Sequence, residues 1–472
     1  MRVRNPRTGK HDFQFEPAGP AELDASTLRL RASQCAWAAR TPQQRAEALL
    51  RWAAALESDA ARITSALERD TGRRALSQIE LASVVSLIRR WAARAPGLIE
   101  SHSRAGCATS LSGITTSTQL VPYPLVGVIS PWNFPLILSL IDAVPALAAG
   151  CAAIVKPSEI APRFAEPLAA ATQQAPEVAE VLAFVLGEAA TGAALIDRVD
   201  YVCFTGSAAT GRKIATAAAA AFIPASLELG GKDPMIVLAS ADPRRAAQIA
   251  LRASIVNTGQ ACQSIECVLV ARAIAEPFLA ALTEAAGRVR LNHPDIGSGD
   301  IGPFISQRQA QIVAAQLEDA RAKGARVLTG GEVLSLGGGL YLKPTVLCDV
   351  TPGMQVMEEE TFGPVIPVIP FDTLEEAVQL ANRGRYGLSA AVLAATAEEA
   401  EAVAGRLQVG AVSINDGSLT ALVWEAEKTS FKDSGLGPSR MGDCGLTRFL
   451  RRRVLIRQSG AAAPLSAYAE QG

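Results

Sequence analysis

Short runs of apolar residues alternate with longer stretches through the middle of the chain, from residue 124 to residue 240. Each apolar run has the length of a buried strand, and the stretches between them have the length of helices. This alternation is typical of a parallel sheet with helices on both faces. The predicted strands are PLVGVIS, CAAIVK, VLAFVL, YVCFTG and PMIVLA, and the predicted helices lie near 135–148 and 163–174, in a short segment before YVCFTG, and from there to about residue 220.

The chain before this region has two other patterns. From 42 to 70 the apolar residues recur on one helical face, with Thr41 and Pro42 as start signals and Gly72 as the stop signal. Residues 107–123 are small and rich in threonine, with Gly113 at the centre. That alternation predicts a β-hairpin outside the core.

A second α/β segment follows residue 240. We expect a helix over 243–255, a strand at VLVAR, a helix over 275–288 and a last strand near 453–457. Thr373 with Glu376, and Thr396 with Glu399, have the spacing of capping boxes that open helices.

Composition and charge narrow the class of protein. With 472 residues, two or three domains are expected, and 49% hydrophobic with 19% charged residues indicates a globular chain with a large core. A formal net charge of −1 gives no electrostatic footprint for nucleic acid, and we interpret the basic cluster at 440–457 as the solvated rim of a strand. The N-terminus lacks the apolar core of a signal peptide, and prolines interrupt the most apolar region, 121–155. We therefore expect no membrane span and a soluble, cytoplasmic protein.

The eight cysteines do not form a metal-binding pattern. No CxxC pair is present and there are only three histidines, so we expect no metal site, and most cysteines lie in apolar runs as small buried residues. Cys262 and Cys267 share the stretch NTGQACQSIEC. That pair alone leaves open metal ligands, a disulfide, packing residues or a nucleophile.

Three motifs carry candidate chemistry, and each has a plainer alternative. YVCFTGSAATGRKI at 201–214 is a strand, a glycine turn and a helix start, which suits a pyrophosphate but is also an ordinary tight turn, since GxGxxG is absent. CAAIVKPSE at 151–159 ends in a lysine and a glutamate that could grip a ribose or form a surface pair. SLELGGKDP at 226–234 places Glu228 before two glycines that would let backbone approach a flat ligand.

Taken together, these motifs resemble those of the aldehyde dehydrogenase superfamily. The matching pieces occur in one order over nearly the whole chain: Asn133 in SPWNFP, Lys156 and Glu159 in KPSE, Ser207 in FTGS, Glu228 in LELGGK, Cys262 in TGQAC, and Glu360 with Phe362 in EEETFGPV. The resemblance implies an α/β fold with a Rossmann-type NAD-binding domain (1–106 and 124–229), an α/β catalytic domain (230–445), and an oligomerisation flap with a C-terminal tail (107–123 and 446–472). The hairpin would pair with a neighbour's last strand, in a homodimer or homotetramer.

The resemblance also implies a role for each matched residue. Cys262 would attack a small-molecule aldehyde to give a thiohemiacetal, Asn133 would supply an oxyanion donor, and Glu228 would be the base that hydrolyses the thioester. Relatives that pass the acyl group to coenzyme A generally lack that glutamate, so a free carboxylic acid is favoured. The implied cofactor contacts are Ile129, Ser130, Trp132, Lys156, Ser158, Glu159, Gly206, Ser207, Leu229, Gly230, Glu360 and Phe362. Among them, the resemblance places Lys156 and Glu159 at the adenosine ribose, Ser207 at the pyrophosphate, and Glu360 with Phe362 at the nicotinamide ribose. A carboxylate at position 159 would repel a 2′-phosphate, which favours NAD over NADP.

Two departures from the family bear on the substrate. Cys267 stands where an arginine is common, and EKTSFKDSGLG at 427–437 replaces the usual PFGG-type segment. Succinic semialdehyde enzymes typically carry arginines where this chain has Ile141 and Val256, and the residues after Asn133 that line the family's tunnel are apolar: Phe134, Ile137, Leu138 and Ile141. We expect an apolar or aromatic aldehyde, unless these residues simply pack. A semialdehyde dehydrogenase, a non-catalytic binding relative and a thioester hydrolase are the alternatives.

Overall fold

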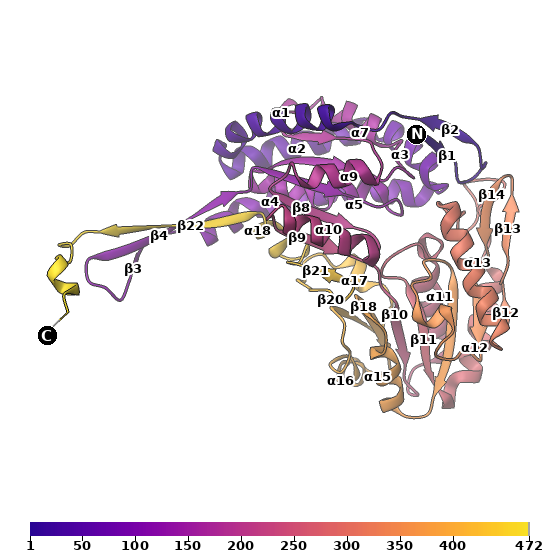
Figure 1. Cartoon of the computed structure of the whole chain (residues 1–472). Helices are drawn as coiled ribbons and strands as arrows, with labels where there is room; N and C mark the ends of the chain where they lie inside the picture. The colour runs from indigo at the N-terminus through magenta and orange to yellow at the C-terminus, as the bar shows by residue number, and fades with distance from the viewer. Residues whose placement is uncertain (471–472) are drawn as a thin grey trace.

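The computed structural model describes residues 1–470, and residues 471 and 472 of the predicted tail lie outside this part. Two large sheets form the two halves of the body, and a long arm projects from it (Figure 1). The first sheet has the strand order β21-β9-β8-β5-β6-β7, and all its pairs are parallel except β21 with β9. The predicted parallel sheet is therefore confirmed, with one antiparallel edge, but the strand predicted at PMIVLA belongs to the second sheet. Its strands are β5 (Leu125–Ile129), β6 (Ala152–Lys156), β7 (Leu182–Phe184), β8 (Tyr201–Thr205), β9 (Ala225–Glu228) and β21 (Gly435–Leu436).

Two of the predicted helices are each broken into two. The helix predicted over 42–70 is interrupted at Asp59, which has φ −99° and ψ 16°. The helix predicted near 135–148 is interrupted at Ile141 and Asp142, and the buried Asp142 carboxylate pairs with Arg440 and Arg448. Breaks of one or two residues change the apolar pattern little, so periodicity alone does not detect them. The helices of this half are α1 (Pro20–Ala39), α2 (Pro42–Ser58), α3 (Ala60–Thr71), α4 (Arg74–His102), α5 (Pro135–Leu140), α6 (Ala143–Ala149), α7 (Ala165–Thr172), α8 (Pro176–Ala179), α9 (Ala189–Ile196), α10 (Ala208–Ala220) and α18 (Cys444–Thr447).

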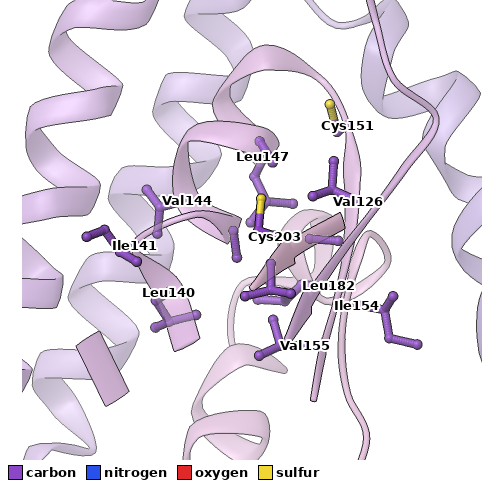
Figure 2. Packing of buried hydrophobic residues seen from close by; sticks show 14 of the residues in the cluster. Val126, Leu140, Ile141, Val144, Leu147, Cys151, Ile154, Val155, Leu182 and Cys203 are labelled. Carbon is purple, nitrogen blue, oxygen red and sulfur yellow. The ribbon is translucent and has the colours of Figure 1, made fainter. Parts of the chain in front are cut away.

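The core of this half contains two of the cysteines. Figure 2 shows Cys151 and Cys203 among Val126, Leu147 and Leu182, and all five are buried. Burial raises the pKa of both thiols. These two cysteines are therefore small packing residues, as their apolar sequence context predicts.

The second sheet has the order β12-β15-β16-β11-β10-β18-β19, with only the β12–β15 pair antiparallel. The Thr373 and Thr396 hydroxyls accept hydrogen bonds from the N–H groups of Glu376 and Glu399, as predicted. Neither glutamate side chain accepts from the N–H of its threonine, so the second bond of each predicted capping box is wrong. The Glu376 carboxylate accepts from the N–H of Asp372 instead. The elements are β10 (Asp233–Val237), β11 (Ile265–Ala271), β12 (Arg326–Thr329), β15 (Thr345–Cys348), β16 (Val365–Phe371), β18 (Ser389–Leu393), β19 (Ala411–Ile414), α11 (Pro243–Ile255), η1 (Val256–Gly259), α12 (Arg272–Arg288), α13 (Gln307–Ala322), α14 (Gln355–Glu358), α15 (Leu374–Asn382), α16 (Ala397–Ala404) and α17 (Leu419–Leu422).

Three small two-stranded sheets complete the body. They are β1 (Arg2–Arg4) with β2 (His11–Gln14), β13 (Val333–Leu336) with β14 (Gly339–Leu342), and β17 (Tyr386–Gly387) with β20 (Phe431–Lys432).

The arm contains the predicted hairpin and the last strand. β3 (Arg104–Ala108) and β4 (Ile114–Pro122) are antiparallel, and β22 (Leu450–Gln458) pairs along the other edge of β4, which lies beside it in Figure 1. The predicted partner of the hairpin was a neighbour's last strand. In the structure the partner is the last strand of the same chain, because the chain returns to the base of the arm at Phe449. A short helix, η2 (Leu465–Tyr468), lies near the tip.

Part of the predicted second domain returns to the first half. β21 pairs with β9, and Leu446 and Phe449 are buried in the first core. Residues on both sides of the predicted boundary at 445 therefore pack against the first half, and the division at 445 stays a prediction. Of the basic cluster, Arg440 and Arg448 are buried, while Arg451, Arg452 and Arg453 are exposed. Within residues 1–470, no helix combines the length and the apolar character needed to span a membrane.

Candidate active site

Four parallel strands of the first sheet end at the same edge. The register pairs Ile129 with Lys156 and with Phe204, and Thr205 with Glu228, so β5, β6, β8 and β9 end side by side. Each predicted residue of this half either closes one of these strands or follows it directly. The structure brings them to one edge: Ile129, Ser130, Trp132 and Asn133 at β5, Lys156, Ser158 and Glu159 at β6, Gly206 and Ser207 at β8, and Glu228, Leu229 and Gly230 at β9.

Asn133 contacts the loop that carries Cys262. This loop lies between η1 and β11, on the second half of the body. The Asn133 side-chain amide donates to the carbonyl of Gln260 at 3.0 Å, and Asn133 is 3% exposed. Because an amide NH₂ has two hydrogens, a second donor of Asn133 is left for another acceptor.

Gly231 allows Cys262 to lie against the end of β9. A Cβ atom at Gly231 would lie 2.5 Å from the Cys262 carbonyl oxygen, and one at Gly230 would lie 2.6 Å from a carboxylate oxygen of Glu360. The sequence suggested that these glycines admit a flat ligand. In the structure they admit two other parts of the chain, since any side chain here would push the loops away.

The Cys262 thiol is held in its neutral form. Burial, then the negative charges of Asp233, Glu228 and Glu360, raise its pKa to about 12, and only Lys428 acts in the opposite direction. A neutral thiol is a weak nucleophile, so a base must take its proton before it reacts. Cys267 lies five residues on, in β11, where it packs with Ile236 and Leu269. Both cysteines are free thiols.

Glu228 has a hydrogen-bond partner that the sequence did not predict. The Ser430 hydroxyl donates to the Glu228 carboxylate at 3.2 Å. β21 pairs Gly435 with Glu228, and this pairing brings the segment 427–437 beside the site. The sequence did show that EKTSFKDSGLG replaces the usual PFGG-type segment. It did not show that Ser430 of this segment contacts Glu228.

Lys428 is the second unpredicted residue of that segment. Its ammonium donates to the Thr420 carbonyl at 2.9 Å, and its charge favours the ionised form of Cys262. Burial lowers the pKa of Lys428 itself. It is therefore the cation that opposes the negative charges around the thiol.

Replacing Lys428 by methionine is expected to slow alkylation of Cys262 by iodoacetamide about threefold at pH 8, because a still higher thiol pKa leaves less thiolate. Mass spectrometry of the Cys262 peptide measures the rate. Lys432→Met is the matched control, since Lys432 lies on the same segment but donates to the carbonyls of Asn382 and Gly384. Equal rates in the two variants would contradict the role of Lys428.

The residues predicted for the adenosine side form a polar rim. Lys156 and Glu159 form an ion pair of 3.1 Å, and the Ser158 hydroxyl accepts from the N–H of Ile160. Ser207 caps α10, where its hydroxyl accepts from the N–H of Thr210. This 13-residue helix directs its free N–H groups toward the edge, which suits a pyrophosphate. The residues present therefore fit a dinucleotide.

A buried ion pair between Lys232 and Glu266 holds the loop that carries the residues predicted to contact the nicotinamide ribose. The Glu266 carboxylate accepts from the N–H groups of Thr361 and Phe362 at 2.7 Å each, and Lys232 lies 2.9 Å from it. This holds the loop of Glu360 and Phe362, in which Phe362 has φ +51°.

Glu360 and Phe362 both contact the strand ends. Glu360 accepts from the N–H of Gly231 at 3.2 Å, and burial raises its pKa. The Phe362 ring meets Trp132 edge-on, with ring centroids 5.5 Å apart. The predicted cofactor residues on the two halves of the body therefore lie next to one another, although the sequence did not single out Lys232 and Glu266.

The predicted tunnel residues divide into two groups. Ile137 and Ile141 are buried in the first core, which fits the simpler packing interpretation, while Phe134 and Leu138 are only half-buried. Val256 is 43% exposed and lies against a separate hollow with Leu251 and Ile301. Phe134 and Leu138 are therefore the remaining candidates for substrate contact.

Comparisons with known proteins identify the family of this chain. A model of the aldehyde dehydrogenase family matches residues 1–455. A putative succinate-semialdehyde dehydrogenase (NADP+) of Mycolicibacterium smegmatis is 36% identical over 443 residues, which are 93% of this chain and 85% of that protein. The structure of the putative aldehyde dehydrogenase PutA from Anabaena variabilis is 49% identical, with a TM-score of 0.96 over 98% of both chains. A betaine aldehyde dehydrogenase from Staphylococcus aureus in complex with NAD+ is 27% identical, with a TM-score of 0.90 over 98% of this chain and 92% of that one. The chain therefore belongs to the aldehyde dehydrogenase family.

Proposed function

We propose that this enzyme oxidises an aldehyde to the free carboxylic acid with NAD, through a thiohemiacetal and then a thioester on Cys262. The observation that carries the proposal is the convergence of Asn133, Glu228 and the Cys262 loop on one sheet edge. A nucleophile, an oxyanion donor and a base are the groups that this reaction needs.

Each of the three residues has one task. Glu228 takes the thiol proton, because the pKa of about 12 leaves almost no thiolate at neutral pH. Cys262 then attacks the carbonyl carbon, and the free N–H of Asn133 stabilises the oxygen as its negative charge develops. NAD, when bound, supplies the acceptor for the hydride of the former aldehyde carbon. Glu228 releases the thiol proton to solvent and then takes a proton from the water that hydrolyses the thioester.

The preference for NAD rests on Glu159. Its carboxylate lies 3.1 Å from the Lys156 ammonium at the end of β6, where the two groups can share ribose hydroxyls. A 2′-phosphate would meet the same carboxylate and be repelled. The name of the M. smegmatis relative indicates NADP and the S. aureus structure contains NAD+, so NADP is the alternative for this chain.

The substrate we favour is an apolar or aromatic aldehyde, because Phe134 and Leu138 are the half-buried candidates for its contact surface. A dicarboxylic semialdehyde is the second candidate. It is supported by the name of the M. smegmatis relative and by Lys428, whose ammonium could attract a carboxylate near Cys262. Exposed Val454, Leu455 and Ile456 on β22 support a homodimer or homotetramer assembled through the arm.

The test is NADH formation with a panel of aliphatic, aromatic and semialdehyde substrates, each offered with NAD and with NADP. We expect turnover with NAD, the largest kcat/KM for an apolar or aromatic aldehyde, and slower turnover with NADP. A semialdehyde as the best substrate would favour the second candidate. No turnover anywhere in the panel would contradict the proposed function.

A further inference from the structure

A buried ion pair of poor geometry lies directly behind Asn133. Arg73 and Glu80 are 4% and 2% exposed, yet their charged groups approach only to 4.0 Å. Two nitrogens of Arg73, Nε and Nη1, and one oxygen of Glu80, Oε1, have no hydrogen-bond partner among the described residues. Burial lowers the pKa of Arg73 and raises that of Glu80. Buried charges with unmet hydrogen bonds cost stability, so the pair is not explained by its contribution to folding.

The bonds that the pair does make converge on one short stretch. Arg73 Nη2 donates to the Asn133 carbonyl at 3.0 Å. Glu80 Oε2 accepts from the N–H groups of Leu136 and Ile137 at 3.0 and 3.3 Å. These N–H groups open α5, whose N-cap residue makes no side-chain cap, so Glu80 acts as the cap from another helix. The pair therefore holds the main chain at Asn133 and at the first turn of α5.

A second set of bonds joins Asn133 to the Cys262 loop. The Asn257 side-chain amide donates to the carbonyls of Asn133 and of Gln260, at 2.9 Å each. The Asn133 amide donates to the same Gln260 carbonyl. Asn257 has φ +59°, a conformation that asparagine tolerates better than most residues. The position of Asn133 relative to Cys262 is thus set by bonds from Arg73, directly before α4, on one side and from Asn257 in η1 on the other.

We propose that Arg73 and Glu80 are positioning residues that orient Asn133 as the oxyanion donor for the thiohemiacetal on Cys262. This rests on the proposed function. The oxyanion exists only after attack on the carbonyl, so a misplaced donor lowers kcat and leaves substrate binding nearly unchanged.

The primary test compares Arg73→Met with Arg45→Met. Arg45 is an equally buried arginine whose guanidinium also donates to main-chain carbonyls, those of Ala148 and Arg40, at the opposite edge of the first sheet. We expect Arg73→Met to lower kcat about 10- to 100-fold with KM within about twofold, and Arg73→Lys to recover most of the loss. Arg45→Met is expected to lower Tm by a similar amount and to leave kcat within about twofold. Equal kcat losses in the two methionine variants would overturn the proposal.

Two further measurements separate this inference from the proposed function. In a double-mutant cycle, Arg73→Met is expected to lower kcat hardly any further when Asn133 is already replaced by alanine. If the kcat of the double variant falls by the product of the two single losses, the proposal is overturned. Hydrogen exchange needs no turnover: the peptide spanning 257–264 should exchange faster in Arg73→Met than in the wild type or Arg45→Met. An inert wild type contradicts the proposed function alone, and unchanged exchange contradicts the positioning role alone.

Discussion

Replacing Cys262 by alanine is expected to abolish NADH formation with every aldehyde, a loss on the order of 10⁴-fold or more in kcat, because no other group can form the covalent intermediate. The thiol is held neutral by burial and by three carboxylates, so its removal should not disturb the fold. The measurement is the rate of absorbance increase from NADH, together with Tm for each variant. Binding of NAD should persist in the alanine variant, since its predicted contacts lie on the strand ends rather than on the thiol.

Cys267→Ala is the matched control for this prediction. Cys267 is five residues away, is also buried, and packs in the core of the second half. Its loss should lower Tm slightly and keep kcat within about twofold. Full activity in Cys262→Ala, or inactivity in Cys267→Ala with an intact fold, would mean that the nucleophile is assigned to the wrong residue.

Replacing Glu228 by glutamine is expected to keep a burst of about one NADH per active site while steady-state turnover falls roughly 10²- to 10⁴-fold. The burst reports formation of the thioester, and the slow phase reports its hydrolysis. The amide cannot accept a proton from water, yet it can still accept the Ser430 hydrogen bond of 3.2 Å. The site geometry should therefore survive the change.

Rapid-mixing absorbance resolves the burst from the slow phase. Measuring the burst at pH 7 and at pH 9 separates the two tasks of Glu228, which are deprotonation of the thiol and hydrolysis of the thioester. Because the pKa of Cys262 is raised to about 12, the thiolate fraction increases with pH throughout this range. A burst that is slow at pH 7 and faster at pH 9 is the expected result if Glu228 also deprotonates the thiol. Equal loss of burst and steady turnover at both pH values would show that hydrolysis is not its separate task.

The elements that the sequence predicted well are those with strong local signals. The runs CAAIVK and YVCFTG contain the fully buried parallel strands β6 and β8, and Gly113 turns the hairpin with φ +74°. The motifs of Asn133, Lys156, Ser207 and Glu228 each lie at the end of a parallel strand, so their convergence at one edge could be foreseen from order alone. The loops of Cys262 and Glu360 precede strands of the second sheet, and their place beside this edge could not be foreseen in that way.

The features that the sequence did not predict depend on contacts between distant segments. Ser430 reaches Glu228 only because β21 pairs with β9, more than 200 residues away. Arg73 and Glu80 lie in what reads as an ordinary helix start. Their role depends on the packing of α4 against the turn after Asn133, which no spacing within either segment encodes.

By itself, the sequence determined the α/β alternation, the family resemblance and the three residues expected to carry the chemistry. These follow from local periodicity and from motifs that each act within a few residues. Only the tertiary structure decided which groups surround Cys262, since the charges around it come from three different segments, which carry Glu228 with Asp233, Glu360, and Lys428. The pKa of a thiol depends on its distance in space from charged groups, and the separation of those groups along the sequence does not give that distance.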